Sequence, residues 1–566
     1  MKARLGNKMV KKHSMNPFNH DIPANREEMV NIHFNGEWVE VPKGLNVVEV
    51  AKSFGEFIPH YCYHPKLSIS GNCRMCLFEM GMPKRDPERK PIIDKNGKPE
   101  LMWIPKPQIG CATPVTEGMG VRTDSPLAKE CRKAIMEFLL INHPLDCPIC
   151  DQAGECKLQE YSTEYGSGES RFVEDKVKKP KNVDLGERIV LDDERCVLCT
   201  RCVRFANEVV NDDILGIVNR GSYNAIAAHE GQRFDNPYSL NTVDICPVGA
   251  LTSKDFRFKM RVWFLKETKS VCSGCGTGCN ITVGSRQDTV YRFTPRSNDA
   301  VNSHWMCDKG RLGFHYLQDE KRITEPHMGK GKLRFITTWE QIYLEIGKQI
   351  KKFKGEEIAI IASARMTNEE LFLLKTWADE LSVVFMDVIS RPQEGDNFLR
   401  SQDCNSNTLG ATMTGVSNRG KNLKKILKGV RDGSIKCMIA WQEDLTEAGF
   451  VSQDLEKLDF LITASILKNT TSDLASFVLP VAGFVEKRGT MINVHSRLQR
   501  LNKAVAVPGK GKEDWEVLCR LREVTGCGNG VHSFDDLFQS MVKNLKPLKG
   551  LNWGKITDLG LDIKIY

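Results

Sequence analysis

Hydrophobic and polar positions follow one pattern before about residue 310 and another after it. Near the start of the chain the segment IHFNGEWVEV, with a turn at Asn35 and Gly36, predicts a β-hairpin. The next segment, LNVVEVAKSFG, is amphipathic and predicts a short helix. The first domain is therefore expected to run strand, strand, helix and then a loop that contains cysteines.

A longer helix is predicted to begin at Ser125, with the serine as cap residue and Pro126 in the first turn. Apolar residues then recur every three or four positions, which predicts a buried face that includes a cysteine. The residues of this predicted face are Leu127, Cys131, Ala134, Ile135, Phe138 and Leu139.

Beyond residue 310, short apolar runs alternate with helical segments. EIAIIAS at 357–363 predicts a buried strand, and Thr367 with Glu370 predicts a capping box for a helix through Leu381. VVFMD, KCMIAW and FLITAS predict three further strands. Alternating strands and helices predict a parallel α/β domain. Such a sheet can hold a nucleotide-like cofactor or serve only for docking and packing.

Composition narrows the class of protein. The chain has 566 residues, of which 41% are hydrophobic and 27% charged, as expected for a globular protein of several domains. No segment approaches the ~18 uninterrupted apolar residues of a membrane helix, so membrane attachment is expected only through a partner. The net charge of +8 is spread along the chain, which argues against a nucleic-acid partner.

Twenty cysteines indicate the chemistry. Disulfides belong mainly to short secreted domains, and the sequence shows no secretory signal, so a reducing compartment is expected. Repeated short cysteine spacings instead favour metal or cluster binding. Fifteen cysteines and one histidine form four sets of four. The cysteines outside these sets are Cys131, Cys404, Cys437, Cys519 and Cys527.

The first set is Cys62, Cys73, Cys76 and Cys111. Its C-x10-C-x2-C run is close to the plant-type ferredoxin pattern, and a Pro/Lys-rich surface excursion, with a turn at Asn96-Gly97, separates it from the fourth cysteine. This set predicts a [2Fe–2S] cluster, with zinc as the alternative.

The second set is His143, Cys147, Cys150 and Cys156. A single histidine is more often a surface or core residue than a ligand, but here it precedes three cysteines that lack a fourth partner. The set predicts a [4Fe–4S] cluster with one imidazole ligand, which makes the site less negative and raises its reduction potential.

The third set is Cys196, Cys199, Cys202 and Cys246, the last followed by proline. Aligned with the bacterial two-cluster ferredoxin pattern, these cysteines belong to one cluster, and all four positions of the twin cluster lack cysteine. The third set therefore predicts a ferredoxin-like domain with a single [4Fe–4S] cluster.

The fourth set is Cys272, Cys275, Cys279 and Cys307, spaced C-x2-C-x3-C-x27-C with small residues between the first three. Zinc ribbons use paired C-x2-C knuckles, so this unpaired spacing favours a third [4Fe–4S] cluster. The whole prediction is one [2Fe–2S] and three [4Fe–4S] clusters, with iron bound by sixteen residues.

A row of clusters is suited to carrying electrons. No G-x-G-x-x-G segment after a strand and no G-x-x-x-x-G-K-[ST] loop occurs, so no NAD, flavin or ATP site and no catalytic residue is predicted in this chain.

The order of these four sets resembles that of the large iron–sulfur subunits of respiratory complex I, the G subunits of bacterial NADH:quinone oxidoreductase. The likeness is specific over about 30–310. Beyond that, TSDLASFVLP and VEKRGTMINVHSRLQR resemble segments of molybdopterin-dependent oxidoreductases, to which the C-terminal part of that protein is related.

The resemblance implies an α/β and α+β multidomain fold. It contains a β-grasp [2Fe–2S] ferredoxin-like domain, a His/Cys cluster segment, a ferredoxin-like [4Fe–4S] domain and a molybdopterin-oxidoreductase-like α/β domain without molybdopterin. The expected parts are a basic, disordered extension at 1–29, then 30–122 with an insertion at 82–109, 123–165, 166–262, 263–320 and 321–566.

The resemblance also implies a function. Electrons from the flavin of an NADH-binding subunit enter at the first set and pass through the third and second sets toward quinone, while the fourth site is structural. The expected partners are the flavin subunit and other peripheral-arm subunits of complex I, with the proton-pumping membrane arm contacted indirectly. The expected location is the cytoplasmic face of a bacterial inner membrane.

Three other functions stay open at this point. A molybdenum- or tungsten-dependent, NAD-linked formate dehydrogenase can share this N-terminal half, and Cys404 lies near where such enzymes bind the metal, although its DCNSNTLGA context does not fit. A diaphorase-side subunit of a soluble hydrogenase shares the first set. A zinc-stabilised scaffold is the non-enzymatic alternative.

Overall fold

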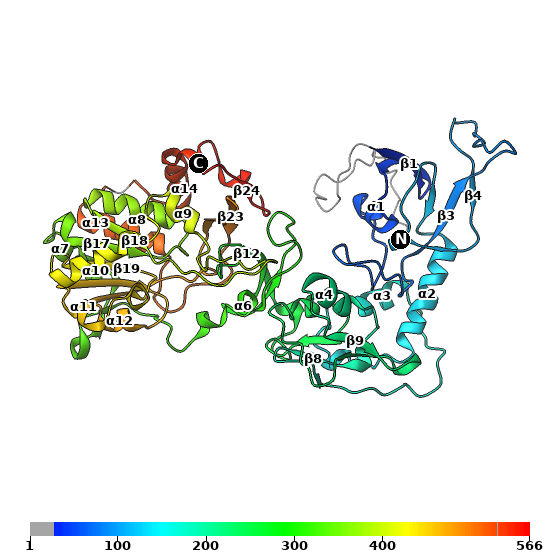
Figure 1. Cartoon of the computed structure of the whole chain (residues 1–566), viewed down its shortest axis with the longest axis horizontal. Helices are drawn as coiled ribbons and strands as arrows, with labels where there is room; N and C mark the ends of the chain where they lie inside the picture. Colours follow the sequence, from blue (N-terminus) through cyan, green and yellow to red (C-terminus); the bar gives the residue numbers. More distant parts are fainter. Residues whose placement is uncertain (1–27, 529, 566) are drawn as a thin grey trace, which may run out of the picture. The chain divides into compact units, whose positions relative to one another are not determined.

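The computed structural model describes residues 28–528 and 530–565 (Figure 1). Of the predicted N-terminal extension, residues 1–27 lie outside this range. The described residues form two compact units, divided between Trp263 and Phe264.

The first unit begins with the predicted hairpin. Strands β1 (Met29–Phe34) and β2 (Glu37–Pro42) are antiparallel, and Asn35 and Gly36 between them both have positive φ. Helix α1 (Val47–Ser53) follows as predicted, with the Asn46 side chain accepting a hydrogen bond from the Glu49 amide.

These strands belong to a mixed sheet in the order β2-β1-β6-β3-β4, with β5 paired to β3. The pairing of β1 with β6 is parallel and the other pairings are antiparallel. The remaining strands are β3 (Leu77–Pro83), β4 (Leu101–Trp103), β5 (Gln108–Ile109) and β6 (Gly120–Arg122). A core of apolar side chains from the sheet and α1 includes Ile32, Val50 and Phe78.

Helix α2 (Pro126–Leu140) begins where predicted, with the Ser125 side chain accepting a hydrogen bond from the Ala128 amide. Its fully buried residues are not those of the predicted face, whose members are half-buried apart from the exposed Phe138. The buried residues are Ala128, Arg132 and Met136. Cys131 is only partly buried, and Phe138 is 73% exposed. Arg132 can take a buried position because its Nη2 donates a hydrogen bond to the Thr123 carbonyl at 2.6 Å.

The rest of the first unit is built from short elements. One sheet has the order β11-β8-β7, and β9 pairs with β10 in a separate hairpin. The strands are β7 (Val183–Asp184), β8 (Ile189–Leu191), β9 (Leu215–Val218), β10 (Ala225–Ala228) and β11 (Leu251–Ser253). The helices are α3 (Lys157–Tyr165), α4 (Arg201–Val209) and α5 (Asn241–Ile245).

The second unit contains two small antiparallel sheets, β12-β13-β14 and β22-β23-β24. Their strands are β12 (Lys266–Val271), β13 (Asn280–Arg286), β14 (Thr289–Pro295), β22 (Gly489–Ile492), β23 (Arg497–Leu501) and β24 (Leu561–Asp562). Apolar residues of both sheets share one core, which includes Ile281, Phe293 and Leu501.

A seven-stranded sheet of order β16-β15-β21-β20-β19-β17-β18 forms the centre of the second unit. The run from β21 to β18 is parallel, as predicted, and β15 and β16 are antiparallel additions. The strands are β15 (His327–Met328), β16 (Phe335–Ile336), β17 (Ile358–Ala362), β18 (Phe385–Val388), β19 (Cys437–Trp441), β20 (Phe460–Ser465) and β21 (Phe477–Pro480).

Helices cover both faces of this sheet. In β17, Ile358 and Ile360 pack in a core with α7, α8 and α13, whereas Ala359 and Ile361 pack in a second core with α10 and α11. Figure 1 shows α8 and α13 on one side of the strands and α11 and α12 on the other. The helices are α6 (Asp308–Arg311), α7 (Trp339–Ile350), α8 (Asn368–Glu380), α9 (Thr408–Met413), α10 (Leu423–Asp432), α11 (Ser452–Glu456), α12 (Thr470–Leu474), α13 (Asp514–Thr525) and α14 (Phe534–Asn544).

The predicted capping box of α8 is confirmed: the Thr367 side chain accepts from the Glu370 amide, and the Glu370 side chain accepts from the Thr367 amide. Across 28–528 and 530–565, none of the helices is both long enough and apolar enough to cross a bilayer.

Candidate metal centres

The first set of cysteines is brought together by the loop before β3 and the turn after β5. Cys62, Cys76 and Cys111 are buried and Cys73 is partly buried. Hydrogen bonds with the Cys111 and Cys73 side chains lower the pKa of Cys62, and a hydrogen bond with Cys111 lowers the pKa of Cys76. Each thiol of the set therefore contacts at least one other. Two backbone amides also donate to sulfur: Tyr61 N to Cys73 Sγ and Cys111 N to Cys76 Sγ, each at 3.5 Å.

The third set surrounds a cavity. Its walls include Cys196, Cys199, Cys202 and Cys246 together with Arg201. The chain can wrap this space because Leu198 and Thr200 both adopt left-handed backbone conformations. The Leu198 amide donates to Cys196 Sγ at 3.4 Å. Burial raises the pKa of Cys199 to about 11.

The fourth set surrounds a similar cavity in the second unit. Cys272, Cys275, Cys279 and Cys307 line it with several glycines. The Gly310 amide donates to Cys307 Sγ at 3.3 Å, and an added Cβ at Gly310 would lie 3.1 Å from Cys272 Sγ. Glycine at this position therefore lets the backbone approach two sulfurs of the set.

The second set is only partly assembled. Cys147, Cys150 and Cys156 lie close enough for their charges to interact, and burial raises the pKa of Cys150 and Cys156. Burial and then the charge of Arg195 lower the pKa of His143 to about 4. The ring is therefore neutral at pH 7, the form that binds metal. Within the described ranges the His143 ring has no hydrogen bond to these thiols, so its membership of the set stays a prediction.

Gly249 joins the second and third sets. It follows Cys246, Pro247 and Val248, and a Cβ added there would overlap Cys150 Sγ. The Lys157 amide also donates to the Pro247 carbonyl at 2.9 Å. The CPVG segment that begins with a third-set cysteine therefore packs directly on the second set.

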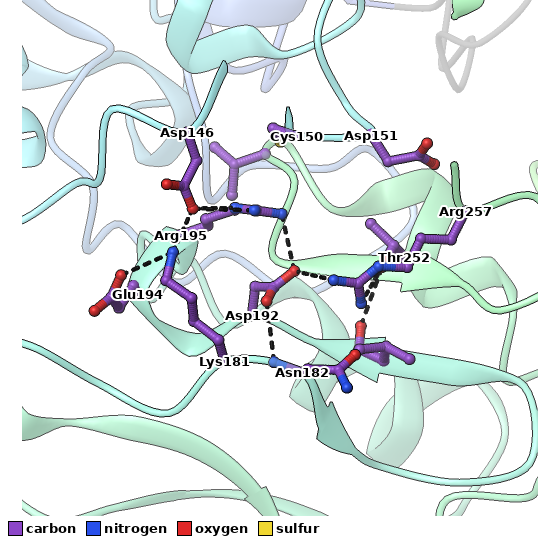
Figure 2. A network of polar contacts seen from close by, with 12 residues as sticks. Asp146, Cys150, Asp151, Lys181, Asn182, Asp192, Glu194, Arg195, Thr252 and Arg257 are labelled. Atoms are coloured by element: carbon purple, nitrogen blue, oxygen red, sulfur yellow. Dashed lines mark hydrogen bonds and ion pairs between the residues drawn. The ribbon is translucent and has the colours of Figure 1, made fainter. Parts of the chain in front are cut away.

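A charged network links the same two segments (Figure 2). Arg195, beside Cys196, is 3% exposed and lies between Asp146, beside Cys147, and Asp192. Its ion pairs measure 3.0 Å to Asp146 and 2.8 Å to Asp192.

Two more basic side chains complete this network. Arg257 reaches Asp192 at 2.9 Å, and Lys181 lies between Asp146 and Glu194. Because every charge in it has a partner of opposite sign, the network holds the two ligand segments together without leaving a buried charge unpaired.

The third and fourth sets each place four thiols around one cavity. In residues 28–528 and 530–565, no three His, Cys, Asp or Glu side chains are arranged as a site for a metal ion. The thiols of the third and fourth sets lie around the walls of their cavities, and backbone amides point at their sulfurs. Thiolate donors with amide hydrogen bonds match what iron–sulfur clusters require.

The cysteines outside the four sets have ordinary surroundings. Cys437 and Cys519 pack in the core beside the central sheet. Cys404 is partly buried in a loop, and Arg365 Nη2 donates to its carbonyl at 3.3 Å.

Sequence reasoning missed Arg201, Arg195 and Gly249. The sequence signal that could have found them is their position, because each lies within three residues of a cysteine of the third set.

Five known domain families match successive parts of the chain. The 2Fe-2S iron-sulfur cluster binding domain matches 27–126, the NADH-ubiquinone oxidoreductase-G iron-sulfur binding region matches 132–171, and the ferredoxin-like domain of NADH-quinone oxidoreductase subunit 3 matches 186–252. The molybdopterin oxidoreductase Fe4S4 domain matches 265–319, and molybdopterin oxidoreductase matches 383–524. The predicted fold class is confirmed, and so is the presence of both 2Fe-2S and 4Fe-4S binding domains.

Named relatives show the same likeness. The G subunit of the Rickettsia felis NADH-quinone oxidoreductase is 40% identical over 353 residues, covering 62% of this chain and 49% of that protein. Subunit 3 of the Thermus thermophilus enzyme is 36% identical over 378 residues, covering 64% and 48%. The mitochondrial NADH dehydrogenase [ubiquinone] iron-sulfur protein 1 of Solanum tuberosum is 40% identical over 352 residues, covering 62% and 45%. The predicted resemblance to G subunits is confirmed, and the chain spans about half the length of these relatives.

Proposed function

We propose that this chain is an electron-transferring iron–sulfur subunit of a proton-translocating NADH:quinone oxidoreductase. The observation that carries the proposal is the cavity walled by Cys196, Cys199, Cys202 and Cys246. The Leu198 amide donates a hydrogen bond to Cys196 Sγ at this cavity. The same residues lie within the match to the ferredoxin-like domain. Bound iron–sulfur clusters exchange single electrons. No flavin, NAD or quinone site is part of the proposal for this chain.

The proposed ligands are the sixteen residues predicted from the sequence. The first set holds one [2Fe–2S] cluster, the other three sets hold [4Fe–4S] clusters, and molybdopterin is not bound. The hydrogen bonds that join the four thiols in a chain support the first site, and the two cavities support the third and fourth. The second site has the weakest geometric support, because only its three cysteines are grouped.

The proposed route runs from the flavin-bearing NADH-binding subunit to the first set, then to the third and second sets, and on toward quinone. Packing of third-set segments against both the loop after Cys62 and the loop containing Cys150 supports this order. The proposed partners are that NADH-binding subunit and other peripheral-arm subunits. They would hold this chain at the cytoplasmic face of a bacterial inner membrane, with the membrane arm reached indirectly.

The proposed domain limits are those expected from the sequence, including the cluster segments at 123–165 and 263–320, except that the first domain includes Met29, where β1 begins. The matched family ranges 132–171 and 265–319 lie close to them.

Iron and acid-labile sulfide analysis of anaerobically purified chain tests the proposal. About 14 iron and 14 sulfide per chain are expected. Low-temperature EPR of the reduced sample should resolve one binuclear and three tetranuclear signals. Colourless protein without sulfide would contradict the proposal, and stoichiometric molybdenum or tungsten would favour the formate dehydrogenase alternative.

A further inference from the structure

Arg201 connects two of the proposed cluster sites. It lies between Cys199 and Cys202 and lines the third-set cavity. Its Nη1 donates to the carbonyl of Ile245, the residue before Cys246, at 3.0 Å. Its Nη2 donates to the carbonyl of Tyr63, the residue after Cys62. One guanidinium therefore holds backbone from the first ligand loop and from the third.

The third nitrogen of this guanidinium has no acceptor. Arg201 Nε is shielded from solvent and makes no hydrogen bond. No carboxylate among the described residues forms an ion pair with Arg201. A buried charge and a buried donor are both costly unless something compensates them. Arg201 instead lines the same cavity as Cys196, Cys199, Cys202 and Cys246.

Two other arginines beside the sets, Arg195 and Arg400, differ from Arg201 because each has a carboxylate partner. Arg195 pairs with Asp146 and Asp192, and Arg400, on the wall of the fourth cavity, lies 3.9 Å from Asp396. These side chains have carboxylates that balance their charge. Arg201 is therefore left with the contents of the third-set cavity as its compensating group.

The neighbouring Arg204 strengthens the link between the two loops. Its Nη2 donates to the Cys62 carbonyl at 2.5 Å and to the Cys199 carbonyl at 3.2 Å, and its Nη1 donates to the Ser68 carbonyl. Asn72 Nδ2 also donates to the Leu198 carbonyl at 2.9 Å. The first ligand loop is thus bound along its length to the backbone that carries the third set.

We propose that Arg201 is a positioning residue that contacts the cofactor: its Nε donates a hydrogen bond to the tetranuclear cluster of the third set, while Nη1 and Nη2 hold the ligand loops of the third and first sets together. This inference rests on the proposed function, because it requires clusters at both sites.

A measurable consequence follows from charge. Each cluster becomes more negative when reduced, so a nearby cation and a donated hydrogen bond favour the reduced form. Hydrogen bonds to charged groups contribute about 1.5–3 kcal/mol, and about 1.4 kcal/mol corresponds to tenfold in an equilibrium constant. Loss of the guanidinium should therefore make reduction of the third-set cluster about tenfold less favourable, which is about 59 mV for one electron.

The test compares Arg201→Gln and Arg201→Lys with the wild-type chain and with Arg220→Gln, which removes the same charge at an exposed position of the same unit. Each protein is prepared anaerobically with arginine labelled by nitrogen-15. Iron and sulfide are counted, potentials are measured by EPR redox titration with dithionite, and nitrogen couplings are measured by pulsed EPR.

If its iron content is unchanged, Arg201→Gln should lower the reduction potential of the third-set cluster by about 59 mV. The reduction potential of the first-set [2Fe–2S] cluster should also fall, but by less. Arg201→Gln should also lose a nitrogen coupling present in Arg220→Gln. Arg201→Lys, which keeps the charge without Nε, should shift less and lose the same coupling.

Wild-type potentials and an unchanged nitrogen coupling in an iron-replete Arg201→Gln would overturn the inference. If Arg201→Gln loses iron, Arg201→Lys takes its place in the test. Wild-type potentials and an unchanged nitrogen coupling in an iron-replete Arg201→Lys would then overturn the inference. Absence of iron and sulfide from the wild-type chain would instead refute the proposed function itself.

Discussion

At the scale of single residues, close approach and burial decide which side chains can occupy the site positions. Gly249 shows the first effect, because only the lack of a Cβ leaves room for Cys150 Sγ. Glu369 shows the second. It is fully buried, its carboxylate accepts two hydrogen bonds from Thr490, and burial raises its pKa to about 7.

We expect Gly249→Ala to abolish the second site. The new methyl group would take the space of Cys150 Sγ, so one thiol could no longer reach the cluster. The measurement is iron per chain with EPR, and a loss of about four iron and of one tetranuclear signal is expected. Gly216→Ala is the matched control, because a Cβ there has no atom within 4 Å. Full iron in Gly249→Ala would contradict the packing of these two segments.

Glu369→Gln should change how stability depends on pH. A carboxyl group whose pKa rises from 4.5 to about 7 on folding adds stability below pH 4.5, and this contribution is lost as pH rises to 7. The neutral amide removes that dependence. At pH 8 the free energy of unfolding should rise by at most about 3 kcal/mol relative to wild type, with little change at pH 5.

Hydrogen exchange of β22 in urea at the two pH values measures this effect. Glu356→Gln is the control, because Glu356 is exposed on the same unit. An equal effect of Glu369→Gln at pH 5 and pH 8 would contradict a buried, protonated Glu369.

At the scale of elements, the sequence located helices and strands better than it identified their buried faces. The Ser125 cap and the capping box of α8 are local, since each joins residues three positions apart. The face that α2 buries depends on distant partners. Met136 lies beneath Tyr61, whose hydroxyl contacts its sulfur at 3.3 Å, and this contact cannot be inferred from helical periodicity.

The corrected face of α2 can be tested by two substitutions. Met136→Ala should lower the free energy of unfolding of the first unit by about 2–5 kcal/mol, because it opens a cavity in a closed core. Phe138→Ser should change it by no more than about 0.5 kcal/mol, because the ring is exposed. Urea unfolding, followed by hydrogen exchange in α2, measures both. The opposite ranking would restore the face predicted from the sequence.

At the scale of the whole molecule, the two units gain stability in different ways. Much of the first unit consists of short elements and loops around three cysteine sets; its described residues form one six-stranded sheet of short strands and two sheets of three and two strands. The second unit has a seven-stranded sheet with an apolar core on each face, in addition to the fourth set. Bound clusters should therefore contribute more to the stability of the first unit.

Iron removal by a chelator under reducing conditions tests this difference. We expect hydrogen exchange to increase most in the ligand segments 62–76, 143–156 and 196–202, while β17, β19 and β20 keep their protection. Reloading iron and sulfide should restore the first unit, which separates reversible loss of clusters from damage. Equal loss of protection in the central sheet would contradict the prediction.

The sequence by itself determined the grouping of the cysteines, the hairpin, the helix caps and the parallel α/β region. These features depend on residues close together in the chain or on a simple period. Tertiary structure alone decided that α2 buries Met136 rather than Phe138. It also decided that Gly249 leaves space for Cys150, and that Arg201 binds backbone 138 residues away at Tyr63. Those contacts join segments far apart in the sequence, so no local pattern encodes them.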